Sequence, residues 1–177
     1  VDNIISLKAG ELIAAPGGMD DILWSGEIIR HSRILTKVGV VCDVSSLLPK
    51  IDNISSKSAR LVIAPFASES VRDWLDQSWV SLIALISSHF ESIDICVGAN
   101  QVSRAGALAE KIRLHVKIPV SIQSSNLVAL GERVSSARMV ISIDTFTAHL
   151  AAAYDVLTVC LIGGGHPGEF GPWRHSA

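Results

Sequence analysis

The chain has 177 residues, of which 49% are hydrophobic and 18% are charged, whereas soluble domains carry roughly 25% charged residues. This length predicts one domain, or one domain with an additional fragment. The 15 basic and 17 acidic residues give a net charge of -2. That balance excludes the clustered basic surface of a nucleic-acid-binding domain and an acidic disordered tail.

Targeting, membrane and metal signals are absent from the sequence. No apolar run reaches the roughly 18–20 residues that a membrane span requires, and no signal-peptide pattern opens the chain. Cys42, Cys96 and Cys160 are widely spaced, which is typical of reduced thiols and not of a disulfide frame or a zinc site. We therefore expect a reducing compartment, no metal and no cofactor.

The first 58 residues differ in pattern from the rest. Residues 22–38 contain a helical stripe of Ile28, Leu35 and Val38, and the polar stretch 49–58 is typical of a linker. We therefore predict a connecting segment over 1–58 and a second domain over 59–177. The chain starts at Val1 and its last residues close no element, so we expect a fragment of a longer protein.

Five short apolar runs rich in β-branched residues follow. Runs of this length suit strands that are covered on both faces. They occupy residues 61–64, 93–97, 119–122, 139–143 and 157–162.

Helical patterns separate these runs. Apolar residues recur at i, i+3, i+4 and i+7, as on one face of a helix. The stripes are Trp79, Leu82, Ile83 and Ile86; Ala105, Leu108, Ala109 and Ile112; Leu127, Leu130 and Val134; and an alanine-rich segment over 149–154. The alternation predicts an α/β fold: a Rossmann-like parallel sheet with helices on both faces.

Ligands of such sheets bind beyond the carboxyl ends of the strands, so the loops there are the candidate site. After the first strand come Ser68 and Arg72, and the guanidinium is suited to bind a phosphate through two hydrogen bonds. The alternative is a surface arginine beside Asp73. After the second strand, Gly98 and Asn100 form either a turn that admits a flat ring or only a tight turn.

The fourth strand is followed by 144–149, which holds Asp144, Thr145, Phe146, Thr147 and His149. Thr145 or Thr147 is suited to cap the next helix. A helix N-terminus has free N–H groups and partial positive charge, and it therefore attracts anions. His149 either contacts a phosphate or packs in the core.

The last strand is followed by a glycine-rich loop that includes Gly164 and Gly165. Glycine permits close approach of a ligand to the backbone, although a flexible loop has the same composition. Together the four loops predict a site for one anionic ligand, such as a nucleotide diphosphate.

The segment 140–153 reads VISIDTFTAHLAAA and leads through an apolar strand to a glycine-rich loop and Pro172-Trp173. This order resembles the D-T-x-x-x-H-L-A-A-A pattern of the bacterial heptosyltransferase family, glycosyltransferase family 9. The loop 65–74 is similar to the family's P-x-A-x-x-x-x-K-x-W, with Arg72 in place of lysine. The resemblance covers roughly 58–173.

The resemblance implies one half of a GT-B glycosyltransferase, the half that binds a nucleotide-sugar donor such as ADP-heptose. The other half would pack on this one, bind a glycan or lipid-linked acceptor and supply the catalytic base, which we do not identify here. By position, Ser68 and Arg72 would meet one side of the diphosphate, and 144–147 with His149 nearby the other. The implied location is cytoplasmic, with at most peripheral contact at the inner membrane face.

Two positions depart from the family pattern. Phe146 stands where many members have glycine, which puts close approach of a phosphate there in question. Asn100 or Gln101 stands where some members use glutamate to hold the sugar portion of the donor. The alternatives are therefore a nucleotide-sugar epimerase-like GT-B enzyme and a GT-B-like module without catalytic activity.

Overall fold

The computed structural model describes residues 27–37, 39–41, 50–52 and 56–162. Contacts divide the chain into two units, and the described residues from 50 onward belong to the unit that holds the sheet. The other unit contains helix α3 (Glu27–Lys37). This helix falls within the predicted stripe of 22–38, although Val38 lies outside the described residues.

The second unit alternates strands and helices as predicted. In chain order it contains β1 (Arg60–Ala64), α4 (Asp76–Ile86), β2 (Ser92–Cys96), α5 (Val102–Arg113), β3 (Val120–Gln123), α6 (Leu127–Ser136), β4 (Met139–Ile143), α7 (Phe146–Ala153) and β5 (Thr158–Leu161). Every predicted strand is present, shifted by one residue at most at either end. Helix α7 begins at Phe146, three residues before the predicted start.

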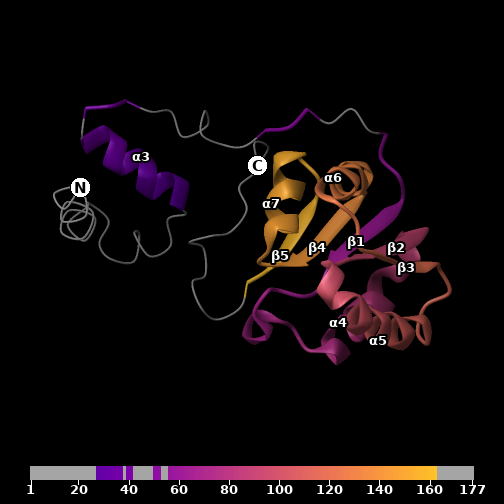
Figure 1. The fold of residues 1–177 in the computed structure, drawn as a ribbon. Helices are drawn as coiled ribbons and strands as arrows, with labels where there is room; N and C mark the ends of the chain where they lie inside the picture. Colours follow the sequence, from indigo (N-terminus) through magenta and orange to yellow (C-terminus); the bar gives the residue numbers. More distant parts are fainter. Residues whose placement is uncertain (1–26, 38, 42–49, 53–55, 163–177) are drawn as a thin grey trace. The chain divides into compact units, whose positions relative to one another are not determined.

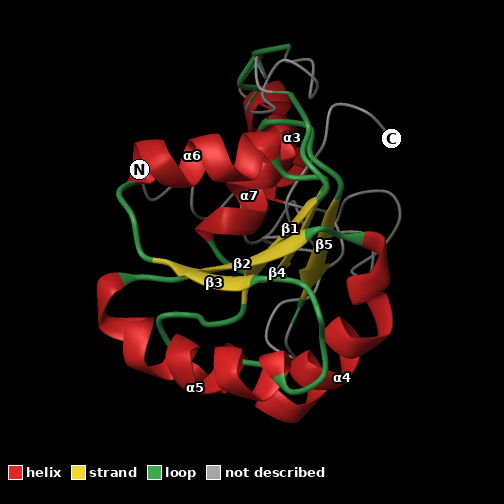
Figure 2. Cartoon of the chain, turned by 90° about the vertical axis from the view of Figure 1, so that its right-hand side faces the viewer, coloured by secondary structure: helices red, strands yellow, loops and turns green. Residues whose placement is uncertain are grey.

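The five strands form one parallel sheet in the order β3-β2-β1-β4-β5. Figure 2 shows α6 and α7 on one face of the sheet and α4 and α5 on the other. This is the predicted Rossmann-like α/β fold. The order reverses between β1 and β4, so their carboxyl ends form the switch point where such sheets bind ligands.

Alternation along the strands supplies two apolar layers. Leu61 and Ile63 of β1 face α4 and α5, whereas Val62 faces α6 and α7, and all three are fully buried. Because both faces are covered, the strands read as continuous apolar runs. The predicted stripe of α5 is wholly buried, but Leu127 of the α6 stripe is 69% exposed. Leu127 is the first residue of α6.

The ends of the predicted linker that the structure describes are hydrogen-bonded to the second unit. The Ile51 N–H donates to the carbonyl of Ala153 at 2.9 Å, and the Ser58 N–H donates to the carbonyl of Ser136 at 2.8 Å. These bonds satisfy carbonyls at the ends of α7 and α6, which have no partner inside a helix. The division into 1–58 and 59–177 stays a prediction.

Candidate functional site at the carboxyl edge of the sheet

Arg72 joins the loop after β1 to the end of β4. Its Nη2 donates to Ser68 Oγ at 3.0 Å, and its Nη1 donates to the Asp144 carbonyl at 3.3 Å. Arg72 and Ser68 are exposed, and Asp144 is partly buried. The structure therefore brings these three predicted residues together, on the β4 side of the switch point.

The alternative for Arg72 was a surface arginine beside Asp73; Arg72 is exposed, but the charge of Asp73 is paired with Arg104. Asp73 Oδ1 accepts from the Ala67 N–H at 2.7 Å, and its other oxygen accepts from Arg104. The guanidinium of Arg104 lies 4.0 Å from the centre of the Phe66 ring. Asp73 is thus turned into the loop, and its partner comes from α5.

The first turn of α7 presents free amide groups. Thr145 is the N-cap residue, but its hydroxyl makes no cap hydrogen bond and lies 2.9 Å from Ser142 Oγ. Its carbonyl accepts from the Ala148 N–H at 3.0 Å. Within the part of the chain that the structure describes, no acceptor meets the N–H groups of Phe146 and Thr147. These two donors, with the positive end of the helix dipole, are suited to an anion.

His149 lies one turn further along α7. Its Nε2 is 3.9 Å from Asp144 Oδ1, and its side chain is 46% exposed. The alternative in which His149 packs in the core is therefore wrong. His149 is an exposed residue beside Asp144, on the same side of the fold as Arg72.

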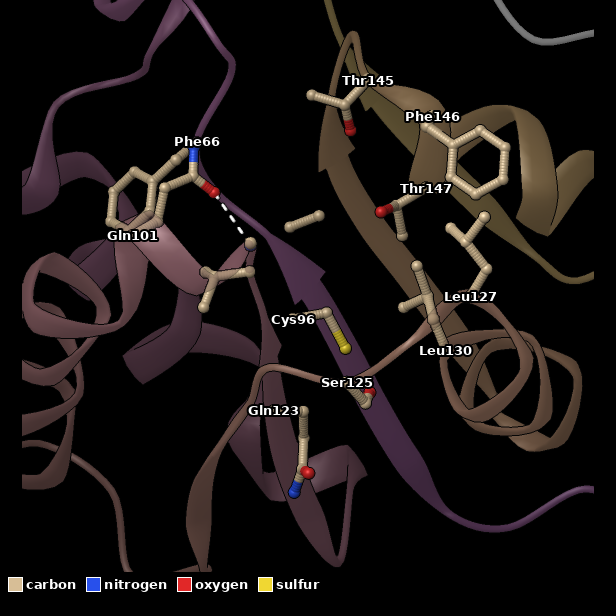
Figure 3. A pocket seen from close by; sticks show the side chains of 13 residues that line it. Phe66, Cys96, Gln101, Gln123, Ser125, Leu127, Leu130, Thr145, Phe146 and Thr147 are labelled. Atoms are coloured by element: carbon tan, nitrogen blue, oxygen red, sulfur yellow. Dashed lines mark hydrogen bonds between the residues drawn. The ribbon is translucent and has the colours of Figure 1, made fainter.

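A cavity of about 200 Å³ lies at the carboxyl ends of β1, β2, β3 and β4. Figure 3 shows the polar and apolar side chains that line this cavity. Of the predicted site residues that are described, Gly98, Thr145, Phe146 and Thr147 line this cavity, whereas Ser68, Arg72, Asp144, His149 and Asn100 do not. Arg72 instead lines a second cavity, with Trp74, Ile143 and Cys160. Gly164 and Gly165 lie outside the described residues.

The loop after β2 is held by Gln101 and not by Asn100. Gln101 Nε2 donates to the Ala67 carbonyl at 2.9 Å, and its Oε1 accepts from the Gly98 N–H at 3.1 Å. Asn100 is exposed, and its Oδ1 lies 3.1 Å from where a Cβ on Gly98 would stand. Glycine at 98 therefore leaves room for the Asn100 side chain.

Several residues of this cavity were not predicted. They are Phe66, Cys96, Gln123, Ser125, Leu127 and Leu130, with the ends of β1 and β2, whereas Gln101 is the predicted alternative to Asn100. The carboxyl-end rule could have found Gln123 and Ser125, which follow the third apolar run. Leu127 and Leu130 belong to the apolar stripe of α6, and that stripe predicts packing in the core and not at a cavity.

Two described cysteines lie near the site, and both are protonated at neutral pH. Burial, reinforced by the Asp94 charge, raises the pKa of the Cys96 thiol from 9.0 to about 12, although Arg133 and Arg60 oppose the shift. Burial and then Asp144 raise the pKa of Cys160 to about 11. A thiol in this state is a poor nucleophile.

The described residues hold no group of three or more His, Cys, Asp or Glu side chains that could bind a metal. In the same part of the chain, no helix combines the length and apolar character of a membrane span.

The family model of glycosyltransferase family 9 (heptosyltransferase) matches residues 37–177. The chain belongs to glycosyltransferase family 9. No curated protein sequence matches the chain.

Among solved structures, this family 9 chain is similar to E. coli heptosyltransferase WaaC with ADP, at 20% identity and a TM-score of 0.60 over 82% of this chain and 46% of the other. The structure of WaaC with ADP-2-deoxy-2-fluoro heptose has 19% identity and a TM-score of 0.56, over 82% of this chain and 47% of the other. A family 9 glycosyl transferase from Veillonella parvula DSM 2008 has 13% identity and a TM-score of 0.64, over 85% of this chain and 48% of the other. At these identities the likeness shows the fold, and the chain spans about half the length of these structures.

Proposed function

We propose that this chain is the donor-binding half of a glycosyltransferase that transfers a heptose-like sugar from a nucleotide diphosphate sugar to a glycan or lipid-linked acceptor. Membership of family 9 supports the transferase class. The observation that carries the donor role is the Arg72 guanidinium. It is hydrogen-bonded to Ser68 and to the carbonyl of Asp144, which lies two residues before Phe146, the first residue of α7. The ADP and fluorinated ADP-heptose bound by WaaC suggest an adenine nucleotide as the first donor to try.

The chemistry follows from the charge that develops on the leaving group. An inverting displacement at the anomeric carbon breaks the bond from that carbon to the diphosphate oxygen, and the electron pair leaves with the nucleoside diphosphate. Arg72 and the amides of Phe146 and Thr147 would stabilise this growing negative charge. The base that removes the acceptor's proton belongs, in this proposal, to the other half of the enzyme.

Calorimetric titration with ADP and UDP tests the donor role. We expect Arg72→Ala to weaken binding by about tenfold or more, because a hydrogen-bonded charge on the phosphate is lost. Arg72→Lys should retain part of the affinity, since it keeps the charge but not the fork of two donors. Arg138→Ala is the matched control: Arg138 is exposed and bonds the His89 carbonyl at the opposite end of the sheet. Equal affinity of wild type and Arg72→Ala would contradict the proposal.

A further inference from the structure

The aromatic ring of Phe146 has no packing role that explains it. Phe146 is the first residue of α7 and is 55% exposed, whereas α7 packs on the sheet through Thr147 and its alanines. Leu127, the first residue of α6, is also 69% exposed, and exposed apolar side chains that gather in one place are typical of a binding surface. Phe146 lines the 200 Å³ cavity together with Leu127 and Leu130 of α6.

Figure 3 shows how the ring lies. It is on the side of Leu127 and Leu130, and the side chains of Thr145 and Thr147 lie between it and the loop after β1. The ring therefore forms part of an apolar wall and leaves the cavity open, so glycine at this position is not needed to keep the space free.

Thr147 supplies a second, independent sign of a ligand. It is only 8% exposed, yet its hydroxyl has no hydrogen-bond partner among the described residues. Figure 3 shows this hydroxyl turned toward the cavity. The hydroxyl oxygen is not among the buried atoms without a partner, so solvent reaches it from the cavity, and a polar group of a bound molecule would replace water as its partner.

From these observations we propose that Phe146 stacks on the nucleobase of the donor. In the same proposal, the hydroxyl of Thr147 forms a hydrogen bond with the nucleoside sugar that is bonded to this base. The inference rests on the proposed function, since the diphosphate held at Arg72 and the α7 amides places the nucleoside next to this cavity. Stacking on an aromatic ring tolerates any base, because every base presents a π-face. Phe146 is thus a positioning residue for the nucleoside and not a selector of its identity.

Binding of ADP, UDP and inorganic pyrophosphate to the full chain separates this inference from the proposed function. We expect Phe146→Ala to weaken the binding of ADP and UDP by about tenfold. The affinity for pyrophosphate should stay unchanged, because pyrophosphate has no base. Phe146→Tyr should restore the affinity, and Phe146→Leu should not. Leu85→Ala, which truncates another exposed apolar side chain on α4, is the control. A nuclear Overhauser contact between base protons and the Phe146 ring gives a direct readout.

Three results would overturn the inference. Unchanged ADP affinity in Phe146→Ala removes the stacking role, although the proposed function survives. Tighter pyrophosphate binding in Phe146→Ala shows that the ring obstructs the anion site. Failure of wild type to bind ADP and UDP, whether or not it binds pyrophosphate, overturns the inference and the proposed function together.

Discussion

Asp73 fixes the loop that carries Ser68 and Arg72. Its side chain is 5% exposed, and it joins the Ala67 amide to Arg104 of α5. Ala67 also accepts from Gln101, so the loops after β1 and β2 are held to each other at this one residue. The position of Arg72 depends on this arrangement, because only the four residues from 68 to 71 separate it from Ala67.

We expect Asp73→Ala to lower the free energy of unfolding by about 1–3 kcal/mol, since it leaves the Ala67 amide without its acceptor. It should also weaken ADP binding: Asp73 does not line the 200 Å³ cavity, but it lines the second cavity together with Arg72. Urea denaturation and calorimetric titration measure the two effects. Asp76→Ala is the control: Asp76 pairs with the exposed Lys111, and such pairs contribute about 0–1 kcal/mol. Equal losses in the two variants would contradict the role of Asp73.

The thiols supply a prediction on pH. Cys96 ionises at about 9.0 when unfolded and at about 12 when folded, so its contribution to stability is complete below pH 9 and is lost as the pH rises toward 12. At pH 8 we expect a thiol reagent to label both Cys160 and Cys96 slowly in a Cys42→Ser variant. Cys160 should react before Cys96, because its pKa of about 11 is lower than the value of about 12 for Cys96. The same variant in urea should react rapidly at both. Rapid labelling of native Cys96 would show that this thiol is not buried as described.

Asp94 joins several elements beneath the site. It lies in the middle of β2 with a side chain 5% exposed, and its Oδ2 is 3.3 Å from Arg60 Nε of β1 and 2.9 Å from Arg133 Nη1 of α6. Ser121 of β3 donates to its other oxygen. One carboxylate thus ties three strands and a helix on the face that α6 covers.

Removing this carboxylate leaves two guanidinium groups close together with no counter-charge. We expect Asp94→Ala to lower the free energy of unfolding by about 3–5 kcal/mol, the range for breaking a buried pair from one side. Chemical denaturation measures the loss. Glu110→Ala serves as the control, since Glu110 is 75% exposed and pairs with Arg113 on the surface of α5. A loss below about 1 kcal/mol for Asp94→Ala would show that the cluster is effectively solvated.

The whole chain spans about half the length of the solved family 9 structures that it resembles. Its sheet places the candidate donor site at one edge, and the described residues offer no base that we can assign to the acceptor. The activity of this chain therefore depends, in our proposal, on a second half that binds the acceptor.

We expect the chain by itself to bind ADP and to transfer no sugar. At 100 times the dissociation constant, a ligand that binds only the folded state stabilises it by about 2.7 kcal/mol, so the melting temperature should rise by several degrees. A transfer assay with ADP-heptose and a glycan acceptor should give no product above background. Product formation by these 177 residues would show that the base and the acceptor site lie within them.

The amino-acid sequence determined the order and class of the elements, because strands and helices depend on local periodicity and on burial of both sheet faces. It also predicted a candidate site at the carboxyl ends of the strands and carried the resemblance to the family that the family model confirms. Only the tertiary structure decided the partners: Asp73 binds Arg104, 31 positions away, and Arg72 reaches Asp144, 72 positions away. Such contacts follow from how the loops meet at the sheet edge, and local patterns do not encode them. For the same reason the direction of the Phe146 ring and the position of Thr147 at the cavity emerged only from the fold.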